Sequence, residues 1–141
     1  MKIMECVPNF SEGRDAAKLK AIAEVLENCS GVRFIDYSGD TDHNRSVYTF
    51  LGEPGALLAA ALAACGKALE LIDMRHHQGV HPRLGAVDVV PFIPLADSPM
   101  QDAVDLAHRF GREFNERFAV PVYFYGAAAL QPERRELADV R

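Results

Sequence analysis

Hydrophobic and polar residues alternate along this chain with two different periods. Alternation at every second residue is typical of a half-buried strand, whereas apolar residues that recur every three to four positions are typical of a helix. Strand-like patterns occur near residues 2–7, 32–37, 46–51 and 86–93, with a last short one at 122–125. Helix-like patterns occur near residues 15–29, 54–73 and 99–118. The chain therefore predicts the order βαββαβ followed by αβ.

Two stretches carry these periods most clearly. The stretch 46–51 places Val47, Thr49 and Leu51 on one face and Tyr48 and Phe50 on the other. The helical stretch 15–29 carries a single apolar stripe, made of Leu19, Ile22, Ala23, Leu26 and Cys29. Pro91 and Pro94 interrupt the last long strand pattern, which favours an edge strand or a bulge there.

Two βα units that flank a central hairpin define the split βαβ, or ferredoxin-like, arrangement. We therefore expect an α+β fold with one mixed or antiparallel sheet, helices packed mainly on one face, and an additional αβ unit at the end. A flavodoxin-like sheet is the competing fold, but it needs helices between all strands, and none fits between Tyr37 and Ser46. A length of 141 residues suits one domain with a genuine core.

Composition limits the classes of partner. The chain has 15 Lys and Arg against 20 Asp and Glu, a formal net charge of −5. A general nucleic-acid or anionic-membrane binder needs a basic face, so we expect neither partner. The most apolar stretch, Ala56–Cys65, is shorter than the ~20 residues of a membrane span. The first six residues contain no long apolar run of the kind a secretory signal needs.

The three cysteines, Cys6, Cys29 and Cys65, are scattered and form no CxxC pair. An odd, scattered set makes a poor disulfide framework and is typical of small buried side chains in a reducing compartment. We therefore expect a cytoplasmic protein.

The stretch Pro8–Arg14 follows the first strand and has two interpretations. Asn9 and Ser11 are good N-cap residues for the next helix, and Glu12 or Asp15 suits its first turn. The backbone N–H groups of that same helix start are alternatively an anion site. Asn9 is the substrate-binding candidate of this stretch.

The polar stretch Asp40–Arg45 joins two predicted strands and is typical of a solvated hairpin loop. Its two aspartates and one histidine match no known metal-ligand spacing. Arg45 stands at the mouth of the second strand, and arginine binds carboxylates through two parallel hydrogen bonds. We therefore expect Arg45 to bind an anionic substrate.

Three of the five histidines and two arginines fall within Arg75–Arg83, namely Arg75, His76, His77, His81 and Arg83. A histidine can accept and return a proton near neutral pH, and nearby arginines keep it neutral and bind carboxylates. No nucleophilic Ser or Cys stands nearby, which favours group transfer between amines over covalent hydrolysis. Adjacent histidines point apart on a helix end, and no Cys or carboxylate stands at ligand spacing, so we expect no metal.

Three motifs resemble those of the glutamate formimidoyltransferases, also called glutamate formiminotransferases. They are ECVPNFSEG at residues 5–13, NRSVYTF at residues 44–50 and HPRLGAVD at residues 81–88. The similarity continues through residues 91–94 and 120–126, so it covers essentially the whole chain in order.

The resemblance implies a specific reaction. Members of this family move the formimino group from N-formimino-L-glutamate to N5 of tetrahydrofolate, the co-substrate, in histidine degradation. Their catalytic histidine lies in a Gly-x-His-Pro-Arg motif, which is Gly79–Arg83 here and makes His81 the acid/base. Arg45, Arg83 and Asn9 are expected to bind substrate, and all four side chains are expected around one concave surface.

The resemblance also implies a partner. Family members hold folate and formiminoglutamate between two similar subdomains, and residues 1–141 match the N-terminal one. We expect a C-terminal subdomain or a second copy as partner, and the chain has no trace of the cyclodeaminase fused to animal members. Two alternatives remain open. One is a non-catalytic folate-binding or interaction module, and the other is a metal-dependent hydrolase that uses the histidine cluster.

Overall fold

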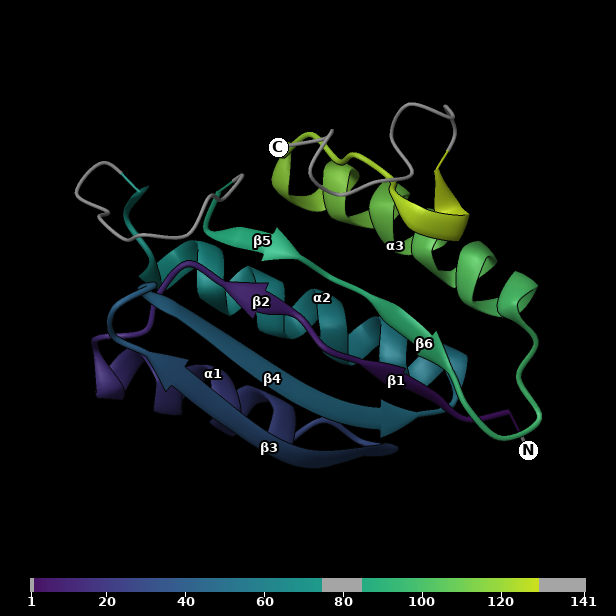
Figure 1. The fold of residues 1–141 in the computed structure, drawn as a ribbon, viewed down its shortest axis with the longest axis horizontal. Coiled ribbons are helices and arrows are strands. Elements are labelled where there is room, and N and C mark those ends of the chain that lie inside the picture. Colours follow the sequence, from purple (N-terminus) through teal and green to yellow (C-terminus); the bar gives the residue numbers. More distant parts are fainter. Residues whose placement is uncertain (1, 75–84, 130–141) are drawn as a thin grey trace.

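The computed structural model describes residues 2–74 and 85–129. The described chain forms a single sheet and three long helices (Figure 1). The elements in order are β1 (Met4–Cys6), β2 (Asn9–Phe10), α1 (Ala16–Glu27), β3 (Val32–Asp40), β4 (Arg45–Gly52), α2 (Pro54–Leu71), β5 (Val87–Val89), β6 (Phe92–Pro94), α3 (Met100–Phe118) and the 3₁₀ turn η2 (Gly126–Ala128). The three predicted helices are confirmed to within two residues at each end.

The pairings in the sheet are antiparallel. Strand β4 pairs with β3 on one side and with both β1 and β2 on the other. Strand β5 pairs with β2, and β6 pairs with β1. The sheet therefore has two broken strand lines next to β4, an inner line of β1 and β2 and an outer line of β5 and β6. Prolines divide each of these two lines, because Pro8 and Pro91 have no N–H to donate to the ladder. The expected α+β class and antiparallel sheet are confirmed, as is the edge position of the proline-rich strand among the described strands.

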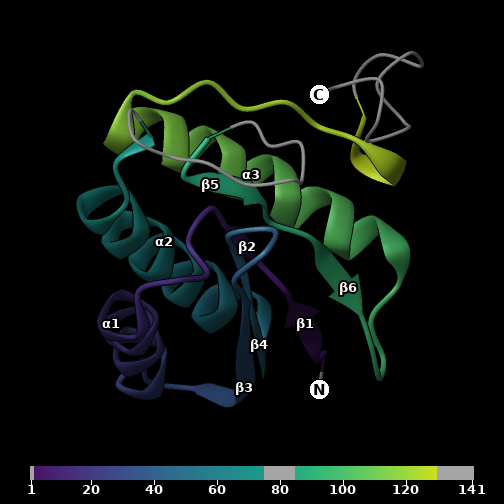
Figure 2. The ribbon, with the colours of Figure 1, turned by 60° about the vertical axis from the view of Figure 1, so that its left-hand side comes forward.

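The core lies between one face of the sheet and helices α1 and α2, which lie behind the strands in Figure 1. Alternate residues of β4 are buried on this face, so Tyr48 and Phe50 are fully buried as their pattern predicts. The hydroxyl of Tyr48 donates a hydrogen bond to the carbonyl oxygen of Leu19 on α1, 2.8 Å away. Helix α3 packs beside β6 and against α2, at the other edge from β3 (Figure 2).

Helix α2 has the length and the apolar composition of a membrane span, with 18 residues and a mean hydropathy of 1.4. The fold gives another reason for that composition. The helix lies between α1, α3 and the sheet and buries eight side chains, Leu57, Leu58, Ala60, Ala61, Leu62, Ala64, Cys65 and Ala68. A helix that is covered on several sides is apolar nearly all round.

The expected strand at residues 122–125 is wrong, because this segment is not paired into the sheet. It lies along α3 instead, where Gly111 lets the Phe124 ring approach the helix. A Cβ on Gly111 would lie 2.6 Å from that ring. The His108 ring meets the Phe124 ring edge-on at 4.7 Å, and its Nε2 lies 2.7 Å from the carbonyl oxygen of Ala128. Contact with the helix has therefore replaced the strand of the additional αβ unit.

Candidate functional site

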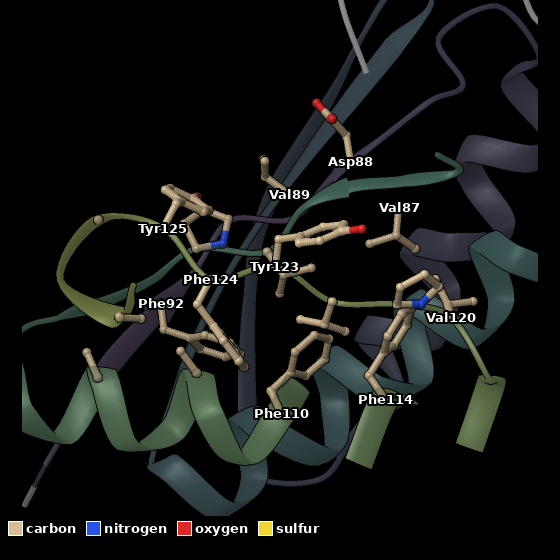
Figure 3. A pocket seen from close by; sticks show the side chains of 18 of the residues that line it. Val87, Asp88, Val89, Phe92, Phe110, Phe114, Val120, Tyr123, Phe124 and Tyr125 are labelled. Atoms are coloured by element: carbon tan, nitrogen blue, oxygen red, sulfur yellow. The ribbon is translucent and has the colours of Figure 1, made fainter. Parts of the chain in front are cut away.

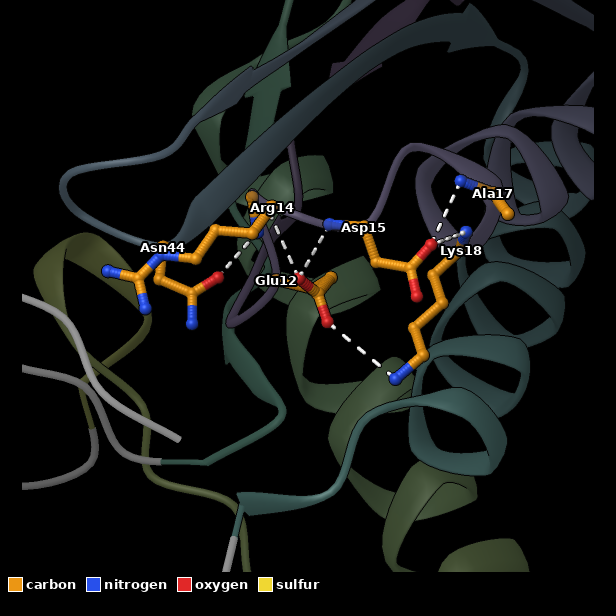
Figure 4. Close-up of polar contacts among 7 residues, drawn as sticks. Glu12, Arg14, Asp15, Ala17, Lys18 and Asn44 are labelled. Atoms are coloured by element: carbon orange, nitrogen blue, oxygen red, sulfur yellow. Dashed lines mark hydrogen bonds and ion pairs between the residues drawn. The ribbon is translucent and has the colours of Figure 1, made fainter. Parts of the chain in front are cut away.

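Two loops that are far apart in the sequence meet at one end of the sheet. The first loop (residues 11–15) follows β2, and the hairpin loop (residues 41–44) joins β3 to β4. The amide of Gly13 donates a hydrogen bond to Oδ1 of Asn44 at 2.9 Å (Figure 4). Nε of Arg14 donates to the carbonyl oxygen of Thr41 at 2.7 Å. The first loop is thereby fastened to the end of the hairpin.

Carboxylates of the protein occupy the start of α1. Oε2 of Glu12 accepts from the amides of Arg14 and Asp15, at 3.0 and 3.1 Å. Oδ1 of Asp15 accepts from the amides of Ala17 and Lys18, so Asp15 is the N-cap (Figure 4). A side chain of this stretch does cap the helix, but the predicted residues are wrong, because the N-cap is Asp15 and not Asn9 or Ser11, and the first turn of α1 carries no acidic residue. The anion-site interpretation is wrong, because an anion would meet two carboxylates here.

The first loop also contacts Gly85 and Ala86, the two residues that directly follow the histidine-rich segment (residues 75–84) in the sequence. Ser11 is almost fully buried, and its amide donates to the carbonyl oxygen of Ala86 at 2.8 Å. Its hydroxyl donates to the carbonyl oxygen of Gly85. The candidates His81 and Arg83 lie outside the described residues, as do the other members of the histidine-rich segment.

The register of the strands places Asn9 and Arg45 on the same face of the sheet. Asn9 is paired with Val47, and Arg45 precedes Val47 by two residues in β4. Cross-strand partners and residues two apart point to the same side. That side is opposite to the face on which Phe10 and Ser46 are buried. Asn9 and Arg45 therefore share the end of the sheet at which the two loops meet.

The hairpin loop is ordered around Asp40. Its carboxylate accepts from the amides of Asp42 and His43 and lies 2.8 Å from Nδ1 of His43. These hydrogen bonds, led by the one from the His43 amide, hold the pKa of Asp40 below its ordinary value. Among residues 2–74 and 85–129, no three His, Cys, Asp or Glu side chains gather as possible metal ligands.

A cavity of about 550 Å³ lies next to this end of the sheet, between the β5–β6 line, helix α3 and residues 120–128 (Figure 3). Its lining is strongly aromatic and includes Phe92, Phe110, Phe114, Tyr123 and Phe124. Gly85 and Ala86 line it too, so it adjoins the same backbone that Ser11 binds. Its size is in the range of small-molecule sites.

The sequence matches the family model described as formiminotransferase domain, N-terminal subdomain, over residues 3–141. The chain belongs to this family. It is 44% identical to a glutamate formimidoyltransferase of Thermoplasma acidophilum over its whole length and 41% identical to one of Streptococcus pyogenes serotype M1 over 99% of it. It is 45% identical to a formimidoyltransferase-cyclodeaminase of Gallus gallus, again over 99%. The chain spans less than half of these relatives, covering 46%, 47% and 26% of their respective lengths.

Two polar residues of this formiminotransferase subdomain were missed by the sequence reasoning. Asp88 is buried in β5, and in Figure 3 its carboxylate points away from the aromatic rings of the cavity. Asn44 is buried and has a φ of 51°. A lone carboxylate inside the apolar run 86–91 was the available signal for Asp88. Nothing in the sequence reveals the contact between Asn44 and Gly13.

Proposed function

We propose that this subdomain supplies the catalytic half-site of a glutamate formimidoyltransferase, which transfers the formimino group from N-formimino-L-glutamate to N5 of tetrahydrofolate in histidine degradation. One observation carries the proposal. The three motif-bearing segments meet at one end of the sheet, through the Gly13–Asn44 hydrogen bond and the two bonds from Ser11 to Gly85 and Ala86. The family membership supplies the reaction.

His81 is the acid/base of this proposal. It precedes Gly85 by four residues. In the sequence, His81 therefore stands close to the Gly85 carbonyl that Ser11 binds. An imidazole with a pKa near neutral pH is suited to both taking and returning a proton.

Arg45, Arg83 and Asn9 bind the substrate in this proposal. N-formimino-L-glutamate carries two carboxylates, and arginine is the side chain best suited to bind a carboxylate through two hydrogen bonds. Arg45 and Asn9 share one face at the loop-bearing end of the sheet, which supports their roles. The amide of Asn9 can both donate and accept a hydrogen bond, as a formimino group or a pterin ring requires.

A single proton shuttle is enough for both proton transfers that the reaction needs. N5 of tetrahydrofolate attacks the formimino carbon, and the tetrahedral adduct carries an extra proton on N5. His81 takes this proton and delivers one to the glutamate nitrogen, because that nitrogen is a poor leaving group as an anion. The C–N bond to glutamate then breaks, which leaves the formimino group on N5 and releases glutamate as a neutral amine.

A second subdomain or a second copy of this chain completes the site. The longer relatives support this part of the proposal, because each extends well beyond the region that the subdomain matches. We further propose a cytoplasmic location and a ferredoxin-like fold. Counting β1 with β2 and β5 with β6 as single lines gives the βαββαβ order that such a fold requires.

The test is a transfer assay on the protein as its gene encodes it. N-formimino-L-glutamate and tetrahydrofolate are supplied together and separately, and the release of glutamate is measured. We expect release only when both are present. Tetrahydrofolate binding without release would support the non-catalytic module instead, and release without tetrahydrofolate would support a hydrolase.

A further inference from the structure

Asn44 combines three features at the turn into β4. Its φ of 51° places it in the left-handed region, which asparagine tolerates better than most residues. Its side chain is buried, with 7% of the residue exposed. Its Oδ1 accepts the amide of Gly13 at 2.9 Å in a buried hydrogen bond between segments that are 31 residues apart. Asn44 thus joins the hairpin loop to the first loop (Figure 4).

Gly13 lies directly against the backbone of Arg45. A Cβ on Gly13 would lie 2.3 Å from the carbonyl oxygen of Asp40 and 2.6 Å from the backbone nitrogen of Arg45. Contacts that close leave no room for a side chain, so the path of the first loop and the start of β4 are fixed against each other. The Gly13–Asn44 hydrogen bond holds them in this contact.

The same loop also binds Gly85 and Ala86, which directly follow the histidine-rich segment in the sequence and are called its root below. Ser11 lies two residues before Gly13 and binds Gly85 and Ala86 through its hydroxyl and its amide. Arg45 and the root of that segment are therefore linked through a few backbone contacts of one short loop. We therefore expect a loosening at Asn44 to change the placement of Arg45 relative to Gly85.

We propose that Asn44 is a positioning residue for substrate binding, which acts through Arg45. This inference rests on the proposed function, because it takes the anionic formiminoglutamate as the ligand of Arg45. Asn44 does not touch the substrate in this proposal. Its Oδ1 holds the first loop against Arg45, so that the guanidinium meets a substrate carboxylate at a fixed distance from the root at Gly85.

The variants separate the acceptor oxygen from the backbone conformation. Asn44→Asp keeps an oxygen at the Oδ1 position, whereas Asn44→Gly keeps the left-handed backbone and loses the acceptor. We expect Asn44→Gly to raise the KM for N-formimino-L-glutamate about three- to tenfold, the worth of one hydrogen bond, with little change in kcat. We expect Asn44→Asp to restore KM to near the wild-type value. Asn28→Ala removes another asparagine side-chain bond, an exposed one from Nδ2 to the carbonyl oxygen of Glu24 at the far end of α1, and should leave KM unchanged.

A double-mutant cycle tests whether Asn44 acts through Arg45. If it does, Asn44→Gly adds little to the KM of Arg45→Ala, because the group it positions is already gone. If the two effects on KM multiply, Asn44 does not act through Arg45 and the proposal is overturned. A wild-type KM in Asn44→Gly overturns it as well.

A binding measurement tests the role of Asn44 independently of whether the protein catalyses formimino transfer. The ¹⁵N NMR signal of Arg45 Nε is followed while N-formimino-L-glutamate is added. We expect a saturable shift in the wild type and in Asn44→Asp, and a several-fold weaker affinity in Asn44→Gly. This pattern in a protein without transfer activity would support the role of Asn44 and refute the proposed function. Equal affinities, or an Arg45 signal that never responds, would overturn the role of Asn44.

Discussion

The amide of Ser11 donates a hydrogen bond to the carbonyl oxygen of Ala86, 2.8 Å away. Ser11 directly follows β2 and Ala86 directly precedes β5, so the bond joins two distant parts of the sequence. The Ser11 hydroxyl adds a second bond to Gly85. Two adjacent carbonyls at the root of the histidine-rich segment are thus held by a single buried residue. This link is what brings the first and third sequence motifs together.

Replacing Ser11 by alanine tests that link. Ser11→Ala removes the hydroxyl bond to the part-buried Gly85 carbonyl oxygen, so the free energy of unfolding should fall by about 1 kcal/mol in urea denaturation. The transfer rate should fall as well. Ser98→Ala is the matched control, because its hydroxyl donates to the carbonyl oxygen of Ile3, which precedes β1, whereas Ser11 follows β2. It should lower stability without changing the rate, and equal rate losses in both variants would contradict the positional role of Ser11.

Gly13→Ala tests the close contact between the first loop and the hairpin. The new Cβ would press on backbone atoms, which cannot rotate away, so we expect a loss of at least ~2 kcal/mol in stability. Gly55→Ala is the control, because a Cβ there meets nothing within 4 Å and the residue lies in α2. It should stabilise the protein by about 0.5–1 kcal/mol. Similar thermal midpoints for the two variants would refute the contact.

Tyr48→Phe tests the buried bond between β4 and α1. Losing the hydroxyl that donates to Leu19 should lower the free energy of unfolding by about 1–2 kcal/mol at neutral pH. Tyr37→Phe is the control, since its half-buried ring stacks on that of Tyr48 at 5.2 Å and keeps the stack when the hydroxyl is lost. Its effect should stay below about 0.5 kcal/mol.

The stability difference between wild type and Tyr48→Phe should depend on pH. Burial raises the pKa of Tyr48 well above its ordinary value of about 10, so the native state keeps the proton that the unfolded state loses. Stability from this group is therefore fully present below pH ~10 and falls as the pH rises further, by up to about 1.4 kcal/mol per unit. The gap between wild type and Tyr48→Phe should narrow between pH 10 and 11. A constant gap would contradict the raised pKa.

The three cysteines should differ in reactivity. Burial raises the pKa of the Cys6 and Cys65 thiols strongly and that of the half-buried Cys29 thiol less. A thiol reagent should therefore modify one thiol per native chain, slowly, and all three after unfolding. Cys29→Ala should abolish the native reaction. Native modification of Cys6 or Cys65 would show that the core face of β1 and α2 is open.

The local periods of hydrophobic residues were sufficient to predict most of the helices and strands. The alternation across residues 46–51 reappears as alternating burial in β4, and the stripe on residues 15–29 is the buried face of α1. The strand expected at residues 122–125 failed for a tertiary reason. Its β-rich composition is equally suited to covering a helix, and Gly111 opens a place for Phe124 on α3.

The candidate site was predicted only in part. The two polar loops at residues 8–14 and 40–45 were recognised from composition, and Asn9 and Arg45 do share one face of the sheet. The third polar stretch lies outside the described residues. The roles given to Asn9, Arg45, His81 and Arg83 stay predictions. Asn44 and Gly13 were missed as a pair because they are 31 residues apart, and no local pattern carries information on a contact of that kind.

The central claim is that the histidine-rich segment contributes the proton shuttle of formimino transfer, and one measurement tests it most directly. The kcat of His81→Ala is compared with that of wild type and of His108→Ala in the protein as its gene encodes it. His108 is the control, because it lies on α3 with Nε2 beside the Ala128 carbonyl oxygen. We predict that His81→Ala lowers kcat by about 10²–10⁴-fold with tetrahydrofolate binding nearly intact, while His108→Ala stays within a few-fold of wild type. Turnover by His81→Ala within a few-fold of wild type would contradict the claim.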